Sequence, residues 1–299
     1  MKQLIILSGK GGTGKTSVTA AFAHLAAQSP LADQVILADA DVDAANLELV
    51  LQPRLREEQN FKGGKIAVIN QDSCTACGKC RDVCRFDAIT GADGLYAIDP
   101  IACDGCAACV YQCPSESIAM HEQIAGKFYF SESRYGPLYH ANLFPGQENS
   151  GKLVTLVKQR ARLHALDENR KLVIVDGPPG IGCPVISAVS GASLALIVAE
   201  PTAAGVHDMR RVLQTVKHFG VRAVVCINKA DIYPAGADEI ESFCRAGGIE
   251  TVGKIPFDLT VTSAMVAGEA VTAFRQQAPA SVAIAGIWQR VVPCLWEQK

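Results

Sequence analysis

The stretch Gly9-Lys10-Gly11-Gly12-Thr13-Gly14-Lys15-Thr16 decides the fold of this 299-residue chain. It fits the pattern G-x4-G-K-[ST], whose glycines let successive backbone N–H groups turn inward around phosphate oxygens at the start of a helix. In this pattern Lys15 reaches the β- and γ-phosphates, and the Thr16 hydroxyl ligates Mg²⁺. The sequence therefore predicts a nucleotide-phosphate site. Its expected residues are Gly11, Gly12, Thr13, Gly14, Lys15, Thr16 and Ser17.

Short apolar runs alternate with helical patterns through most of the chain. Each run is continuous and apolar, as expected of parallel strands that are covered on both faces. The alternation predicts an α/β fold with a doubly wound, mostly parallel sheet. The clearest strands are expected at Leu4–Leu7, Val35–Ala38, Leu172–Val175, Leu194–Val198 and Ala223–Ile227.

Composition excludes several classes of protein. A net charge of −2 gives no basic surface for nucleic acid, and no apolar run approaches the roughly 18 residues of a membrane-spanning helix. The run after Met1 and Lys2 is too short for a signal peptide. Near the C-terminus, Pro293 interrupts the apolar segment Ile284–Trp296, so we expect no membrane anchor. We expect a cytoplasmic protein, and in a reducing compartment clustered cysteines are metal ligands before they are disulfides.

Eight of the twelve cysteines lie between Lys65 and Ile124 and form an internal repeat. The segment Cys74–Ile89 maps onto Cys103–Ile118 at a shift of 29 residues, and both copies read C-x2-C-x2-C-x3-C. We therefore expect a small α+β domain, residues 63–126, inserted into a discontinuous α/β domain of residues 1–62 and 127–299.

The spacing of these cysteines is typical of iron–sulfur ligands. Three thiolates two residues apart wrap one face of a cubane, and the fourth must come from a distance. The duplicated pattern resembles two-cluster bacterial ferredoxins, in which the fourth cysteine ligates the other cluster. Zinc is the alternative, but its structural sites favour paired C-x2-C groups. The resemblance implies one [4Fe–4S] cluster on Cys74, Cys77, Cys80 and Cys113, and a second on Cys84, Cys103, Cys106 and Cys109.

Lys10 adds a second lysine to the phosphate loop. A lysine at this position is typical of deviant P-loop proteins, and the chain resembles the group that contains MinD, ParA, Mrp and the nitrogenase iron protein. The resemblance implies a homodimer in the nucleotide-bound state, in which Lys10 crosses to the partner's phosphates as an arginine finger does. The alternative is a solvated loop lysine.

Two acidic segments resemble the switches of the same group. Asp39-Ala40-Asp41-Val42-Asp43 is similar to switch I, which implies that Asp41 orients the attacking water and that Asp39 belongs to the cofactor site. Asp176, at the end of an apolar run, suits a Walker-B partner for hydrated Mg²⁺. The following Gly177-Pro178-Pro179-Gly180 suits switch II. The expected catalytic residues are therefore Lys10, Lys15 and Asp41.

The identity of the base stays open between adenine and guanine. Asn228-Lys229-Ala230-Asp231 spells the N-K-x-D of many GTPases, but related proteins bind adenine with a similar stretch. The resemblance implies ATP, with Asn228 at the base edge and Pro256 against the base.

Cys183 lies seven residues after Asp176, where the nitrogenase iron protein places a ligand for its bridging cluster. The stretch Gly136–Gly151 lacks the second cysteine that such a cluster needs, so burial is the expected state of Cys183. A transient metal or partner contact and a bridging cluster are the alternatives. Cys226, Cys244 and Cys294 are expected to be buried and inert.

The expected function is coupling of ATP hydrolysis to the clusters. The chain would act as an ATP-gated electron donor to a redox partner. Alternatively, it would assist cluster assembly or the maturation of a metalloprotein. ATP-dependent amide synthesis is a third hypothesis, and we disfavour it because no residues are left for a glutaminase domain.

Overall fold

The structure, a computed structural model, describes residues 1–92, 94–147 and 150–297. The chain forms two compact units. The α/β unit comprises Met1–Gln59, Phe128–Asn142 and Ser150–Lys299, and the cysteine-rich unit comprises Asn60–Lys127 and Leu143–Asn149. The predicted insertion, residues 63–126, falls within the cysteine-rich unit, which also takes in residues 60–62, 127 and 143–147.

A nine-stranded sheet with the order β11-β10-β9-β1-β8-β2-β7-β6-β3 organises the α/β unit. From β11 to β7, neighbouring strands pair in parallel, which confirms the predicted mostly parallel α/β fold. The strands are β1 (Lys2–Ser8), β2 (Val35–Asp39), β3 (Arg54–Ile69), β6 (Ile118–Ser133), β7 (Gly136–Leu143), β8 (Leu172–Pro179), β9 (Leu194–Ala199), β10 (Arg222–Asn228) and β11 (Glu250–Ile255). The five predicted strands are β1, β2, β8, β9 and β10.

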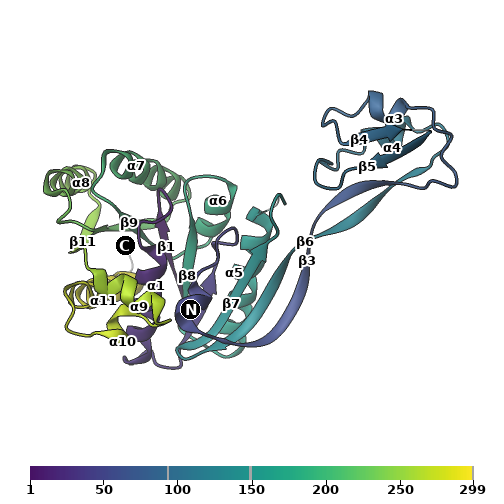
Figure 1. The fold of residues 1–299 in the computed structure, drawn as a ribbon. Coiled ribbons are helices and arrows are strands. Elements are labelled where there is room, and N and C mark those ends of the chain that lie inside the picture. Colours follow the sequence, from purple (N-terminus) through teal and green to yellow (C-terminus); the bar gives the residue numbers. More distant parts are fainter. Residues whose placement is uncertain (93, 148–149, 298–299) are drawn as a thin grey trace. The chain divides into compact units, whose positions relative to one another are not determined.

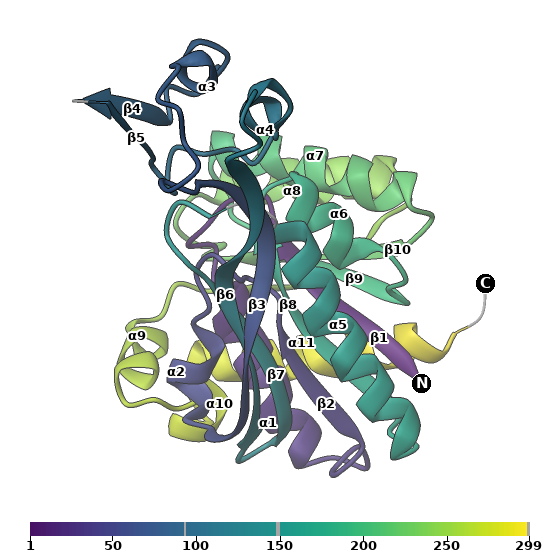
Figure 2. The same cartoon turned by 90° about the vertical axis from the view of Figure 1, so that its right-hand side faces the viewer.

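Helices cover both faces of this sheet (Figures 1 and 2). One face carries α5 (Ser150–Asp167), α6 (Cys183–Val189), α7 (Ala203–His218) and α8 (Pro234–Ala246). The other carries α1 (Lys15–Ala27), α2 (Leu47–Leu51), α9 (Leu259–Val266), α10 (Val271–Phe274) and α11 (Pro279–Trp296).

Alternate strand residues pack into the core beneath α1 and α11. Leu4 and Ile6 of β1 point into this layer, where the ring centroids of Phe22 and Trp288 lie 4.9 Å apart. The sequence suggested that Pro293 interrupts this segment, but α11 continues through Pro293 to Trp296. Val291 and Leu295, on either side of Pro293, are both buried in the same core. In the part of the chain that the structure describes, no helix has the length and apolar character needed to cross a membrane.

The cysteine-rich unit contains α3 (Lys79–Asp82), β4 (Ile89–Ala92), β5 (Leu95–Ile98) and α4 (Ala108–Gln112), with β4 antiparallel to β5. The repeat in its sequence is also a repeat of backbone conformation. Left-handed residues recur at the 29-residue shift, in the pairs Ala76 and Gly105, Gly78 and Ala107, and Asp87 and Glu116.

Hydrogen bonds relate the two halves of the cysteine-rich unit reciprocally. Asn70 N donates to Ser117 O, and at the same shift Asp99 N donates to Ala88 O. Each half therefore ends against the start of the other, as in a pseudo-twofold arrangement.

Candidate functional site

The phosphate loop connects the end of β1 to the first turn of α1. Gly12 and Gly14 adopt left-handed φ angles of 77° and 93°. A Cβ atom on Gly14 would lie 2.4 Å from Nδ2 of Asn228, so this position requires glycine for both conformation and space. The loop thereby presents backbone N–H groups at a helix N-terminus, which is a site for an anion.

Asp176 lies behind the loop, almost fully buried at 1% exposure. Thr16 Oγ1 donates to one of its carboxylate oxygens at 2.7 Å, and Thr19 Oγ1 donates to the other at 2.8 Å. Two threonines on successive turns of α1 thus fix the orientation of this carboxylate. The sequence did not single out Thr19, because a threonine inside a helix carries no distinguishing pattern.

Asp39 is the register partner of Asp176 on the neighbouring strand β2. Its carboxylate accepts hydrogen bonds from the backbone N–H groups of Asp41 and Leu47, both at 3.1 Å. Asp39 therefore holds the turn that presents Asp41.

The three carboxyl groups carry unfavourable negative charge. Burial raises the pKa of Asp39, and the nearby Asp176 raises it further. Burial likewise raises the pKa of Asp176 despite the charge of Lys15, and raises that of Asp41 to about 6. These groups fit Mg²⁺, which is held by one or two carboxylates together with substrate phosphates. A hydroxyl at Thr16 and a carboxylate at Asp176 supply such oxygen ligands.

Glu200 links two lysines at the mouth of the loop. Its Oε2 lies 2.7 Å from Nζ of Lys10, and its Oε1 lies 2.7 Å from Nζ of Lys229. Lys229 also donates to Gly12 O at 3.2 Å. Burial alone would raise the pKa of Glu200, but the hydrogen bonds from Lys10 and Lys229 hold this pKa below its usual value. Sequence reasoning missed Glu200, since only the tertiary fold brings the end of β9 to the loop.

The segment after β10 contacts the loop and the segment after β11. Asn228 Nδ2 donates to Thr13 O at 2.7 Å, so one of its two amide hydrogens is used on the protein. Asp231 Oδ1 accepts from the backbone N–H of Phe257 at 2.6 Å, which ties it to the loop that contains Pro256.

A buried lysine anchors α6, the helix that follows Gly177-Pro178-Pro179-Gly180. Lys158 of α5 donates to Ser187 O at 2.8 Å and to Ser190 O at 2.7 Å, and it also donates to Ala188 O. These carbonyls form the C-terminal end of α6, where a cation is favourable. Burial, with a contribution from Arg162, lowers the pKa of Lys158 to about 8.

Four cysteines line one cavity in the cysteine-rich unit. Cys84 of the first repeat lies there with Cys103, Cys106 and Cys109 of the second, and apolar residues such as Ile89 and Ile98 complete the lining. These four are the expected ligands of one cluster.

The remaining repeat cysteines, Cys74, Cys77, Cys80 and Cys113, do not line this cavity. Cys74 and Cys77 are close enough to Cys80 to contribute to the raised pKa of its thiol, of which burial is the main cause. Cys113 Sγ accepts from Ser117 N at 3.3 Å, and Ser117 Oγ donates to Ser73 O at 2.6 Å. The backbone before Cys74 and the thiol of Cys113 therefore meet at one serine.

Within residues 1–92, 94–147 and 150–297, no three His, Cys, Asp or Glu side chains converge closely enough to bind a single metal ion. A cubane has a different requirement, since four iron atoms separate its four thiolates. All twelve cysteines are free thiols. Cys183, the first residue of α6, is exposed, contrary to the expected burial, whereas Cys226, Cys244 and Cys294 are buried, as predicted.

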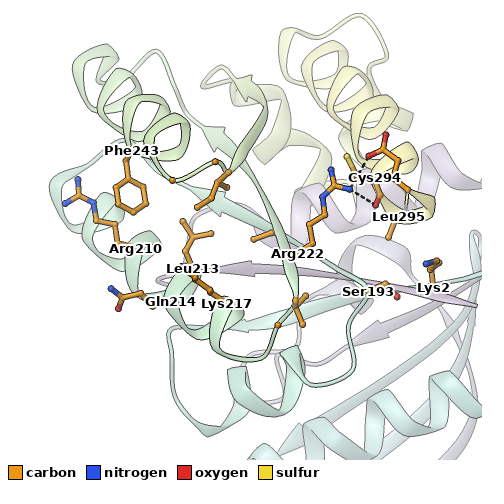
Figure 3. Close-up of a pocket in the computed structure, with 17 residues that line it drawn as sticks. Lys2, Ser193, Arg210, Leu213, Gln214, Lys217, Arg222, Phe243, Cys294 and Leu295 are labelled. Atoms are coloured by element: carbon orange, nitrogen blue, oxygen red, sulfur yellow. Dashed lines mark hydrogen bonds and ion pairs between the residues drawn. The ribbon is translucent and has the colours of Figure 1, made fainter. Parts of the chain in front are cut away.

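A cleft of about 730 Å³ lies away from the phosphate loop, beside the N-terminal ends of β1 and β10 (Figure 3). Its arginines are already paired within the protein. Arg222 contacts Glu297 at 3.1 Å, and Arg210 contacts Glu239 at 2.8 Å and lies over the Phe243 ring. The convergence of loop, lysines and carboxylates makes the loop the candidate site instead.

The fold and the loop define a P-loop nucleotide-binding protein. Residues 4–271 match the CobQ/CobB/MinD/ParA nucleotide binding domain. The chain belongs to this family.

The chain is also similar in sequence to three known proteins and in structure to one solved protein. An uncharacterized protein of Methanocaldococcus jannaschii is 38% identical over 228 residues, which cover 76% of this chain and 78% of the relative. Ferredoxin-1 of Chlorobaculum tepidum is 37% identical over 59 residues, 18% of this chain and 95% of that protein. The cytosolic Fe-S cluster assembly factor Nubp1 homolog of Drosophila willistoni is 26% identical over 144 residues, 42% of this chain and 46% of the relative. The MinD cell division protein of Aquifex aeolicus superposes with a TM-score of 0.59 at 20% identity, covering 100% of this chain and 98% of that one, a likeness of fold alone.

Proposed function

We propose that this protein hydrolyses ATP in a nucleotide-bridged homodimer and couples that cycle to electron transfer through two [4Fe–4S] clusters. We propose that it works in the cytoplasm and donates electrons to a redox protein or metalloprotein.

The first part of the proposal is ATP hydrolysis. The residues from Gly11 to Ser17 would bind the phosphates, with Lys15 on the β- and γ-phosphates. Thr16 and Asp176 would hold Mg²⁺, which offsets negative charge on the phosphates. Asp41 would accept a hydrogen bond from water and orient its oxygen toward the γ-phosphorus, giving ADP and phosphate. Lys10 of the partner subunit would stabilise charge on the transferred phosphoryl group.

Adenine is the proposed base. Guanine recognition by N-K-x-D uses the aspartate to accept two N–H groups of the base, whereas Asp231 Oδ1 already accepts from Phe257 N. The hydrogen bond favours a role for Asp231 in shaping the loop that contains Pro256. The second amide hydrogen of Asn228 would contact the base edge, since the amide carries two hydrogens and one of them is donated to Thr13 O.

The second part is electron transfer, and one observation carries it. Cys84 lies on the same cavity as Cys103, Cys106 and Cys109, so the last cysteine of one repeat joins the first three of the other. These four cysteines would form the crossed donor set that two-cluster ferredoxins use. The other cluster would be held by Cys74, Cys77, Cys80 and Cys113. Each cluster, when bound, supplies a one-electron carrier.

The similarity to Ferredoxin-1 supports this assignment, since it spans 95% of that protein. Fully cysteine-ligated sites also favour electron transfer over donation of a cluster, which needs labile ligands. The second candidate, a role in cluster assembly, rests on the similarity to the Nubp1 homolog.

Anaerobic purification followed by iron and zinc analysis tests the proposal. We expect about eight iron atoms per chain and two low-potential cubane signals. Stoichiometric zinc in place of iron would remove the electron-transfer function. Transfer of iron to an apo-ferredoxin acceptor, with loss of the donor's own signals, would favour cluster assembly.

A further inference from the structure

Glu200 sits at a fixed point beside the phosphate loop. It follows the last residue of β9, and its carbonyl accepts from Thr202 N at 2.8 Å. A Cβ on Gly205 would lie 2.3 Å from that carbonyl oxygen, so the first turn of α7 packs directly against it. The backbone at Glu200 therefore has little freedom to move.

The side chain of Glu200 is directed by its lysines. Each carboxylate oxygen receives one ammonium group at 2.7 Å, Lys10 on Oε2 and Lys229 on Oε1. Lys229 is itself attached to the loop through Gly12 O. Lys229 thus keeps the carboxylate near the loop, while Lys10 is the more exposed of the two lysines, with 36% of its side chain accessible against 29% for Lys229.

The contact opposes the proposed role of Lys10. A lysine paired with a carboxylate of its own subunit has its charge offset and its direction fixed, so it is a poor donor to a second subunit. Nucleotide phosphates in the loop add negative charge beside Glu200, which weakens the pair by repelling the carboxylate and attracting the lysine. Nucleotide binding and the Lys10–Glu200 contact therefore disfavour each other, which is a coupling between two sites.

We propose that Glu200 is a positioning residue that holds Lys10 within its own subunit until nucleotide binds, and so sets the nucleotide concentration needed for dimerisation. The inference rests on the proposed function, because it takes Lys10 to contact the partner's phosphates. Its partner is a second copy of this chain.

Glu200→Gln tests the inference, since it removes the charge and keeps the size of the side chain. The fraction of dimer is measured by analytical ultracentrifugation of the cluster-loaded protein against the concentration of a non-hydrolysable ATP analogue with Mg²⁺. We expect the midpoint to fall at least threefold and dimer to form with ADP. Glu200→Asp, which keeps the charge on a shorter side chain, is expected to shift the midpoint the same way. The Glu200→Asp variant provides the test if Glu200→Gln does not fold stably.

Glu239→Gln is the matched control, because Glu239 pairs with Arg210 on the helices α7 and α8. Its midpoint should equal that of the wild type. An unchanged midpoint in both Glu200 variants would overturn the inference, and a raised one would show that Glu200 orients Lys10 toward the partner instead. The proposed function fails separately, if the wild type does not dimerise with nucleotide or if Lys10→Ala dimerises as well as the wild type.

Discussion

Nζ of Lys10 lies 2.7 Å from Oε2 of Glu200, so the lysine that distinguishes this phosphate loop is bound within its own subunit. The contact places a charged group at the mouth of the site. It also shows that Lys10 is not a freely solvated loop lysine in this structure.

Lys10→Ala should abolish nucleotide-dependent dimerisation and lower ATP turnover by at least about 10³-fold, the effect of removing a cation supplied in trans. Iron content should stay unchanged, because Lys10 belongs to the α/β unit. Lys254→Ala, which removes a surface lysine paired with Glu241, is the control. Turnover of Lys10→Ala equal to that of Lys254→Ala would refute the trans role.

Thr19→Val should weaken Mg²⁺-dependent nucleotide binding by about 10–100-fold, since it removes the donor to Asp176 Oδ1 and lets the carboxylate turn. Thr19→Ser restores the hydroxyl and should restore binding. Titration of Mg²⁺ at fixed nucleotide measures the effect. Equal loss in the serine and valine variants would indicate a packing role.

Activity should depend on the ionisation of Asp41. Burial, only partly offset by Lys15, raises its pKa to about 6, so the group is ionised at pH 7.5 and protonated at pH 5. A protonated Asp41 is a poor acceptor for water, and kcat/KM, which reports the free enzyme, should fall as pH drops through about 6. Asp41→Asn should be inactive throughout while it still binds ATP. A flat profile from pH 5 to 8 in the wild type would exclude this role.

The raised pKa of Asp41 should lower the stability of the folded protein at the pH at which it favours activity. A carboxyl whose pKa is raised on folding favours the folded state when protonated and costs stability when ionised, so this cost appears as pH rises from about 4 to 6 and persists above. Nucleotide-free Asp41→Asn should therefore be more stable than the wild type at pH 7.5, by up to ~3 kcal/mol. Thermal unfolding under anaerobic conditions measures the difference. A less stable variant at pH 7.5 would contradict it.

Cys84→Ala and Cys113→Ala should each remove a different cluster, because in the proposed ligation each cysteine completes the triplet of the other repeat. Iron should fall from about eight to about four atoms per chain in each, and the two should lose different EPR signals. Cys244→Ala, at a buried cysteine outside the repeats, should keep about eight. Loss of the same signal in both variants would disprove crossed ligation.

Continuous apolar runs made the five strands β1, β2, β8, β9 and β10 predictable, since parallel strands covered on both faces need such runs. The 16-residue strands β3 and β6 were missed. The first seven residues of β3, Arg54–Asn60, are exposed and mostly polar, so they carry no periodic signal.

Sequence patterns also located the loop residues, Asp39, Asp41 and Asp176, because local motifs position them. Thr19, Lys158 and Glu200 could not be found in this way. Each acts through a partner more than 25 residues away in the chain, and such contacts exist only after the sheet has formed. The sequence also gave no reason to expect that Asn228 and Asp231 bond to the protein itself.

Potentiometry of the clusters with and without Mg²⁺ and ATP analogue tests the central claim most directly. Coupling predicts that nucleotide shifts the potential of at least one cluster by about 59 mV or more, a tenfold change for a one-electron couple. The shift should be absent in Lys10→Ala. Potentials and reduction rates that are the same with and without nucleotide would contradict the account.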